Sequence, residues 1–421
     1  LIMTRIFIVA ALLLGSFFMA DSDYPYDGFE RTGIKRLKWV EDVQSGKIES
    51  NRLRPGAFYP LSSIKLNLVD RGFDKRPDGL PELDAGLQAN VDGLFRGLNK
   101  NYSMTLLDMS PGKPLRYAEH RPSAQYQPGS VGKLVVLAAF FTGLKHVYPD
   151  SFEKRIELLK SKQIKSGEWA IHDHHTVPVY DLDTGKQVKR KVTNTDVFSL
   201  FEWVDHMVSV SNNGAASVVW REALLMHIFK DKYPELTFEE SEAYFKSQPK
   251  SDLSDFAINT VNQPLRDLGI TEEEWRLGKF FTHGAGSYIP GQGGSIGTPI
   301  GLMKYVMALE EGKIVDRQSS LEMKRLLYLT DRRIRYAYSH KLDSAAVYFK
   351  SGSFYSCDRE KNPNCGDYQG NVYNYMNSVA IIEHPDGSRY AVCLMSNVLN
   401  KNSANDHLAL ADKVDDLVRG N

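Results

Sequence analysis

The sequence predicts an α+β domain in which one antiparallel sheet, built from both ends of the chain, packs with a helical lobe formed by the middle. Strand-like segments occur before residue 121 and again after residue 346, whereas residues 145–300 show mainly helical periodicity. The composition agrees with a globular chain, because 42% of the 421 residues are hydrophobic and 25% are charged.

The first 20 residues are typical of a secretory signal peptide. Arg5 precedes an apolar run over residues 6–14, and residues 15–20, Gly-Ser-Phe-Phe-Met-Ala, then lead into the polar stretch at Asp21. This run is shorter than the roughly 20 residues that span a bilayer. We therefore expect residues 1–20 to be cleaved, and the mature protein to be secreted or periplasmic without a stable membrane span. An uncleaved N-terminal anchor is the alternative.

Two parts follow the signal sequence. Residues 21–80 are rich in turn-forming residues and predict an irregular N-terminal extension on the surface of the main domain, which covers residues 81–421. The main domain begins with an amphipathic helix predicted over 81–98. A strand over 102–109, a turn, and a returning strand from Leu115 come next.

The apolar run 134–141 predicts a helix buried in the centre of the domain, because it is apolar on every side. A hairpin is predicted around residues 183–185, where turn residues separate two strand-like runs. The remaining elements are predicted as helices over 303–309, 320–327 and 408–418 and as strands over 347–349, 376–383 and 389–396.

Three cysteines are few for an exported chain, so the fold depends on its hydrophobic core rather than on a disulfide framework. Cys357 and Cys365 lie eight residues apart in a polar loop, and we expect them to pair after export. Cys393 lies in the apolar run 390–395 and is expected to be a buried small hydrophobe.

The charge balance argues against nucleic acid as a partner. The chain has 52 basic and 52 acidic side chains, and it shows no basic patch of convincing size. A neutral chain has no long-range field that gathers phosphates or anionic lipid. The oligomeric state stays open at this stage.

Ser130 and Lys133 are the first candidates for chemistry. They lie three residues apart at the start of the buried helix, so the amine and the hydroxyl share one face. Free backbone N–H groups at a helix start favour a developing oxyanion, and a desolvated lysine can act as a base. The same spacing occurs elsewhere in this chain, but only Ser130 opens a wholly apolar helix. The segment does not match a phosphate-binding loop, because Gln127 occupies the position where that motif requires glycine.

Two further motifs follow in order. Ser211-Asn212-Asn213 comes in a short loop after a predicted helix, and Lys350-Ser351-Gly352-Ser353 ends a predicted strand. The ordered set SxxK, SxN and K[ST]G resembles class A β-lactamases and their D,D-peptidase relatives, penicillin-recognising serine hydrolases, from about Pro81 to the C-terminus. The segment between Ser130 and Ser211 exceeds the family norm, and residues 167–192 are the candidate insertion.

The resemblance implies a β-lactamase/transpeptidase-like fold and a serine hydrolase that forms an acyl-enzyme and needs neither metal nor cofactor. It implies a small-molecule β-lactam or a peptidoglycan peptide as substrate, and hence antibiotic resistance as a candidate role. By this resemblance, Ser130 would be the nucleophile, Lys133 its activator, and Ser211 the proton donor to the leaving nitrogen. Asn213 would bind the substrate amide, and Lys350, Ser351 and Gly352 would bind its carboxylate. The backbone N–H groups of Ser130 and Ser353 would bind the oxyanion.

Two departures from the family pattern affect this expectation. Asn212 replaces an aspartate, which removes a charge beneath the site. The loop that supplies the deacylating glutamate in class A enzymes corresponds to residues 277–297, which contain no Asp or Glu. The base is then absent, supplied by His283, or brought from residues 272–274, where Thr271 and Glu274 fit a capping box. We expect it to be absent, so that deacylation is slow. A D,D-carboxypeptidase or a penicillin-binding sensor is therefore the alternative function.

The run His172-Asp173-His174-His175 raises the question of a metal site. Adjacent residues on a strand or turn point apart, and no Cys or HExxH partner stands nearby. The sequence therefore predicts no metal centre.

Overall fold

The computed structural model describes residues 25–49, 54–331 and 333–420. The predicted signal peptide at residues 1–20 lies outside the described residues. Within them, one helical stretch, Gly129–Val147, has the length and apolarity of a membrane span, and 78% of it is buried inside the domain. That burial is typical of the core helix of a globular protein.

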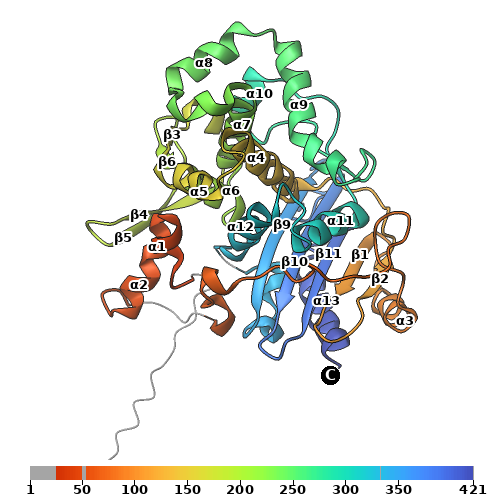
Figure 1. Ribbon diagram of the computed structural model, residues 1–421. Coiled ribbons are helices and arrows are strands. Elements are labelled where there is room, and N and C mark those ends of the chain that lie inside the picture. The colour runs from red at the N-terminus through yellow and green to blue at the C-terminus, as the bar shows by residue number, and fades with distance from the viewer. Residues whose placement is uncertain (1–24, 50–53, 332, 421) are drawn as a thin grey trace, which may run out of the picture.

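A five-stranded antiparallel sheet forms the centre of the fold, and Figure 1 shows orange strands from the start of the chain beside blue strands from its end. The strand order is β2-β1-β11-β10-β9, with β1 pairing β11 from Tyr102 opposite Ser396 to Asp108 opposite Tyr390. The predicted sheet from both chain ends is confirmed. Its strands are β1 (Tyr102–Asp108), β2 (Arg116–His120), β9 (Ala346–Ser356), β10 (Tyr373–Glu383) and β11 (Arg389–Asn397).

The sheet separates two hydrophobic cores, because successive side chains of a strand point to opposite faces. In β11, Val392 and Leu394 face the smaller core, whereas Ala391, Cys393 and Met395 face the larger one. Cys393 is fully buried and unpaired, as predicted. The smaller core is closed by α3 (Ala85–Leu94) and α13 (Ala404–Arg419), and the larger one by the helical lobe with α11 (Pro299–Glu310) and α12 (Arg317–Tyr328).

Helix α4 (Lys133–Val147) lies at the centre of the lobe, as its apolar sequence predicts. Figure 1 shows the other helices of the middle around it, with α8 farthest from the sheet. They are α5 (Phe152–Ser161), α6 (Leu200–Val208), α7 (Asn213–Phe229), α8 (Phe238–Ser247), α9 (Lys250–Asp267) and α10 (His283–Tyr288).

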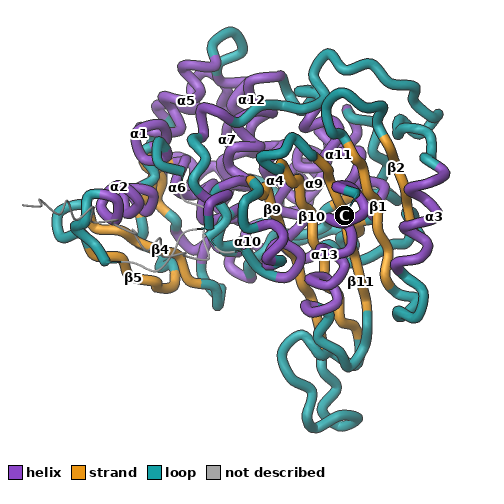
Figure 2. The backbone as a smooth tube through the Cα atoms, turned by 90° about the horizontal axis from the view of Figure 1, so that it is seen from below, coloured by secondary structure: helices purple, strands orange, loops and turns teal. Residues whose placement is uncertain are grey.

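The middle of the chain also contains short strands. The predicted hairpin is confirmed as β4 (Thr176–Asp181) and β5 (Lys186–Lys191). Figure 2 shows it beside α1 and α2 at one end of the molecule, with β1, β2 and α3 at the other. Two strand pairs were not predicted, since each strand is only two or three residues long: β3 (Gln163–Lys165) with β6 (Val197–Ser199), and β7 (Trp275–Arg276) with β8 (Ile296–Gly297).

In its described residues, the N-terminal extension consists of short helices and turns, and several of its side chains enter the core. Its helices are α1 (Gly28–Thr32) and α2 (Lys38–Gln44), joined by a 3₁₀ turn over Lys35–Leu37. Arg36 is fully buried and donates two hydrogen bonds, of 2.6 and 2.7 Å, to the carboxylate of Asp205 in α6. The extension is therefore not confined to the surface, where the sequence placed it.

Helix α3 is shorter than the predicted range 81–98. It begins at Ala85 because the Asp84 carboxylate accepts a hydrogen bond from the Leu87 N–H at 2.7 Å and caps the helix. Leu83, predicted on the buried face, lies before the cap and is 43% exposed.

The predicted pairing of Cys357 with Cys365 is confirmed. The disulfide lies in the connection between β9 and β10, and this loop borders the cavity beside Ser130.

Candidate active site

Ser130 lies in a 3₁₀ helix, Gly129–Gly132, that leads directly into α4. Lys133, the first residue of α4, is fully buried, and its Nζ donates a hydrogen bond to Ser130 Oγ at 2.9 Å. The three-residue spacing thus brings the amine and the hydroxyl together as the sequence indicated.

The backbone of β9 packs tightly against the turn that carries Ser130. A Cβ placed on Gly352 would lie 2.4 Å from the Pro128 carbonyl oxygen and 3.0 Å from the Ser130 nitrogen. A Cβ on Gly129, whose φ is +54°, would lie 3.0 Å from the Ser353 nitrogen. Only glycines allow this approach. It places the two backbone N–H groups predicted for the oxyanion, those of Ser130 and Ser353, on adjoining segments.

The second motif lies in the loop between α6 and α7. Lys133 Nζ donates to the Asn213 Oδ1 at 2.7 Å and contacts Ser211 Oγ at 3.3 Å. It also donates to the Ser211 carbonyl. Ser211 has a φ of +62°, a left-handed conformation that costs a non-glycine residue roughly 1 kcal/mol. This turn directs both oxygens of Ser211 toward the lysine.

Asn212 caps helix α7 in place of the family's aspartate. Its Oδ1 accepts a hydrogen bond from the Ala215 N–H at 2.6 Å, the interaction that an aspartate would make. Its Nδ2 donates to the His175 carbonyl at 3.1 Å, which an aspartate cannot do. The asparagine therefore ties the second motif to the segment that contains His175.

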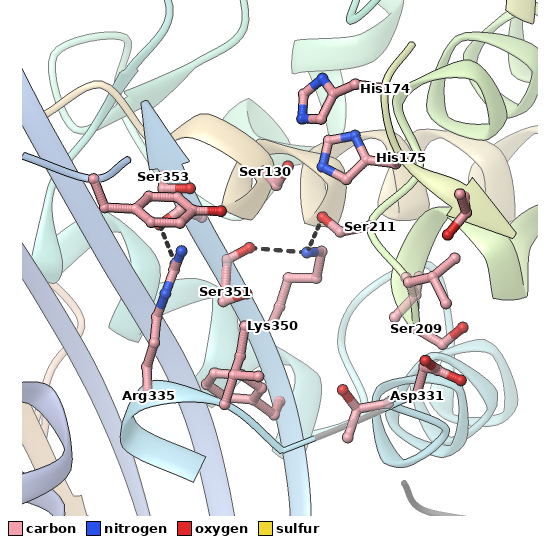
Figure 3. A pocket seen from close by; sticks show the side chains of 18 of the residues that line it. Ser130, His174, His175, Ser209, Ser211, Asp331, Arg335, Lys350, Ser351 and Ser353 are labelled. Atoms are coloured by element: carbon pink, nitrogen blue, oxygen red, sulfur yellow. Dashed lines mark hydrogen bonds between the residues drawn. The ribbon is translucent and has the colours of Figure 1, made fainter. Parts of the chain in front are cut away.

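Lys350 approaches Ser211 from β9. Its Nζ donates to Ser211 Oγ at 2.8 Å and to the Ser351 carbonyl at 2.9 Å. Figure 3 shows both contacts, with Ser130 and Ser353 on the same cavity. The structure thus brings all three motifs together around Ser211.

The electrostatics of the cleft disfavour protonated lysine. Burial lowers the pKa of Lys133 to about 7, although Asp173 opposes this shift. Burial also lowers the pKa of Lys350 well below its usual range, and the charges of Lys133 and Arg335 add to the effect. A negatively charged ligand would relieve this mutual repulsion.

Ser130 lines two adjoining cavities, one of about 400 Å³ and one of about 980 Å³. His174, His175, Ser353 and Tyr368 line both of them. The smaller cavity extends toward Lys350 and Arg335, and the larger one toward α10.

Sequence reasoning did not assign several residues of this cleft. Arg335 donates to the Gly352 carbonyl at 2.8 Å, and its guanidinium lies 5.3 Å from the Tyr368 ring centre. Neither residue belongs to a motif, so the sequence carried no signal for them. Asp173 and His175 belong to the histidine-rich run, which the sequence analysis tested only as a metal site.

The carboxylates at 272–274 lie apart from both cavities within the described residues. Thr271 N–H donates to the Glu274 carboxylate at 2.9 Å, and Glu274 N–H donates back to Thr271 Oγ1 at 3.3 Å. The predicted reciprocal pair is confirmed, but it closes a turn and no helix follows. Glu274 also pairs with Lys304 at 2.5 Å. His283, by contrast, lines the larger cavity.

Asp173, His174 and His175 offer ligand atoms within 4.8 Å of one another. However, Asp173 Oδ1 and His175 Nδ1 are hydrogen-bonded at 2.7 Å, and the His174 side chain is 84% exposed. These contacts satisfy the carboxylate without an ion.

The chain belongs to the β-lactamase enzyme family, whose model matches residues 86–414. The match covers the sheet, the helical lobe and all three motifs. Family and fold together support a serine hydrolase of the superfamily that contains β-lactamases and penicillin-binding proteins. A search of curated proteins finds no match.

Solved structures share the fold at low sequence identity. A β-lactamase from Chitinophaga pinensis DSM 2588 has a TM-score of 0.52 and 14% identity, over 80% of this chain and 100% of that one. A class A β-lactamase from Bacteroides cellulosilyticus DSM 14838 gives 0.51 and 13%, over 80% and 98%. An acyl-enzyme complex of a PBP-A mutant with penicillin G gives 0.51 and 13%, over 81% and 98%. These matches establish the β-lactamase/transpeptidase-like α+β fold.

Proposed function

We propose that the protein is an exported serine hydrolase that forms an acyl-enzyme on Ser130 and hydrolyses β-lactams or related amides and esters. The observation that carries the proposal is the convergence of Lys133 on Ser130 Oγ at 2.9 Å and on the second motif. A lysine whose pKa is lowered to about 7 by burial is partly neutral at neutral pH and can accept a proton.

In the acylation step, Lys133 Nζ takes the proton of Ser130 Oγ as that oxygen attacks the substrate carbonyl carbon. The negative charge on the carbonyl oxygen is stabilised by the N–H groups of Ser130 and Ser353. The carbon–nitrogen bond then breaks, and the leaving nitrogen receives a proton through Ser211, which lies between Lys133 and Lys350. The acyl group remains as an ester on Ser130.

The substrate we propose carries a carboxylate. Lys350 and Arg335 both line the smaller cavity beside Ser130. Asp331 also lines it, and its carboxylate pairs with Lys189 at 2.8 Å. An anionic substrate group would favour the protonated form of Lys350 and would pair with it beside Arg335, in agreement with the roles inferred for Lys350, Ser351 and Gly352.

The alternative is a D,D-carboxypeptidase or a penicillin-binding sensor that acylates without efficient turnover. The lack of carboxylates at residues 277–297, together with the outward position of residues 272–274, favours it. The two functions differ in the fate of the acyl-enzyme.

Incubation with a fluorescent penicillin and a chromogenic cephalosporin, read by intact mass and absorbance, tests the proposal. We expect one penicilloyl group on the wild-type protein and none on Ser130→Ala, whose melting temperature should match that of the wild type. Undiminished labelling of Ser130→Ala would refute the nucleophile. Continuous cephalosporin turnover indicates a β-lactamase, whereas a single acylation indicates a sensor.

Export is part of the proposal, and N-terminal sequencing of protein made in its native host tests it. We expect a mature chain that starts near Asp21 and contains the Cys357–Cys365 disulfide. A chain that retains residues 6–14, with free thiols at both cysteines, would contradict export.

A further inference from the structure

A histidine outside the three motifs lies on the wall of the cleft, and a buried aspartate lies behind it. His175 lines both cavities together with Ser130, and Figure 3 shows its ring beside Ser211. His175 Nδ1 lies 2.7 Å from Asp173 Oδ1. Because an ionised carboxylate only accepts hydrogen bonds, the proton of this contact belongs to Nδ1. The other ring nitrogen, Nε2, then carries a lone pair.

Asp173 is held in one orientation. Its side chain is 3% exposed, and its Oδ2 accepts hydrogen bonds from the backbone N–H groups of Asn213 at 2.6 Å and Gly214 at 3.3 Å, at the positive end of α7. Burial opposes ionisation, but hydrogen bonds from His175 and from the Asn213 N–H outweigh it and hold the pKa of Asp173 well below its usual range. The carboxylate therefore fixes the tautomer of His175 at neutral pH.

Hydrogen bonds also fix the backbone of His175. Its carbonyl accepts the hydrogen bond from Asn212 Nδ2, and its N–H donates to Asp173 Oδ1 at 3.2 Å. No described residue bonds to Nε2, which is the nitrogen left for a ligand or a water in the cleft. Burial lowers the pKa of His175, and although Asp173 opposes this shift, the nearby Lys133 reinforces it. A neutral imidazole is the form that a general base requires.

We propose that His175 is the general base that activates water to hydrolyse the acyl-enzyme, with Asp173 as its positioning residue. This inference rests on the proposed acylation of Ser130. His175 Nε2 takes a proton from the water as the water oxygen attacks the ester carbon. The carbon–Oγ bond then breaks, His175 returns the proton to Ser130 Oγ, and the carboxylic acid product leaves.

The geometry favours His175 over the bases that the sequence offered. His283 lines only the larger cavity, and no described carboxylate orients its ring. The carboxylates at 272–274 face neither cavity in the described part of the chain. With His175 as the base on the cavities beside Ser130, the lack of carboxylates at residues 277–297 no longer implies slow turnover.

The test separates acylation from deacylation with a fluorescent penicillin. In His175→Asn we expect one equivalent of acyl-enzyme at a rate within about threefold of the wild type, and deacylation slowed by about 10²-fold or more. Asp173→Asn should slow deacylation less. His174→Asn is the matched control, because its exposed ring is the immediate neighbour, and it should deacylate like the wild type. His283→Asn should do the same.

A second measurement distinguishes base catalysis from a structural effect. Added imidazole should restore deacylation of the His175→Ala acyl-enzyme in proportion to its concentration and should leave His174→Asn unchanged. If neither His175 variant acylates, the preformed wild-type acyl-enzyme is treated with diethyl pyrocarbonate, which modifies histidines. Peptide mass spectrometry then locates the modified histidine. Deacylation must then stop in the fraction modified at His175.

The outcomes separate the two proposals. If wild-type Ser130 is not acylated, the proposed function fails, and this inference fails with it. If acylation proceeds and the acyl-enzyme of His175→Asn decays as fast as that of the wild type, only the inference fails. A wild-type acyl-enzyme as persistent as that of His175→Asn overturns the inference too.

Discussion

The Lys133 amine is fully buried and makes hydrogen bonds to Ser130, Ser211 and Asn213. Those contacts orient it, while burial lowers its pKa to about 7. Orientation and desolvation thus come from the same packing of α4 against the loop between α6 and α7. The residue that we infer to be the base of acylation is partly neutral at neutral pH because the fold excludes water around it.

A prediction for the pH dependence of acylation follows. A base acts in its deprotonated form, so the rate of penicillin labelling should rise about tenfold per pH unit below about 7 and level off above it. The second-order rate constant between pH 5.5 and 9 measures this. Lys133→Ala should lose about 10²- to 10⁴-fold in rate and also lose the step near pH 7. A wild-type rate that does not change with pH would rule out Lys133 as the base.

Lys350 should act on binding rather than on proton transfer. Lys350→Ala should lower the acylation efficiency of substrates with a carboxylate by about 10- to 100-fold, the size expected when one charge-assisted hydrogen bond is lost. Neutral esters of similar size should lose much less. The ratio of kcat/KM for matched acid and ester substrates measures the difference. Equal losses for both would exclude the anchoring role.

Some residues of the site could be predicted from the sequence and others could not, and the difference has a physical cause. The three motifs were recognisable because each needs its residues at fixed local spacing, such as Ser130 and Lys133 on one helix turn. Arg335 and Tyr368 approach the cleft from separate loops, and no local pattern encodes that approach. Asp173 and His175 were visible as a polar run, but their pairing with the start of α7 depends on tertiary packing.

At the scale of elements, the long strands and helices were predictable from periodicity, whereas their ends depended on single interactions. Helix α3 begins at the cap made by Asp84. The capping residue was visible in the sequence, but the apolar periodicity extended the predicted helix beyond it. The strands β3, β6, β7 and β8 have two or three residues each, too few to show a period.

The connection between β9 and β10 supports a prediction about binding. Its disulfide, Cys357 to Cys365, closes a short loop before Tyr368, which lines both cavities and stacks near Arg335. The double variant Cys357→Ser/Cys365→Ser should unfold with a free energy lower by about 2 kcal/mol. We expect a higher KM with little change in the saturating acylation rate. Urea unfolding and stopped-flow labelling measure the two effects, and reduced wild-type protein is the control. An unchanged KM would show that the loop does not shape the cleft.

At the scale of the whole molecule, the described residues 25–49 and 54–80 pack against the sheet and the lobe, and none of them lines either cavity. Lys324 of α12 is fully buried and pairs with Glu310 of α11 and Glu383 of β10, each at 2.6 Å. The extension completes this network, because Lys324 Nζ donates to the Lys65 carbonyl at 2.7 Å and the Asn67 N–H donates to Glu310 at 2.6 Å. The extension therefore satisfies buried charges that the sheet and the lobe share.

The other anchor of the extension is the Arg36–Asp205 pair, in which both side chains are fully buried. Arg36→Met leaves the Asp205 carboxylate buried without its charge partner, which typically costs about 3–5 kcal/mol. Arg36→Met/Asp205→Leu removes both charges and should recover most of that loss, because an apolar pair of similar volume avoids the desolvation cost. Chemical denaturation of the wild type and both variants measures the free energies. If Arg36→Met unfolds within 1 kcal/mol of the wild type, the buried Arg36–Asp205 pair does not anchor the extension.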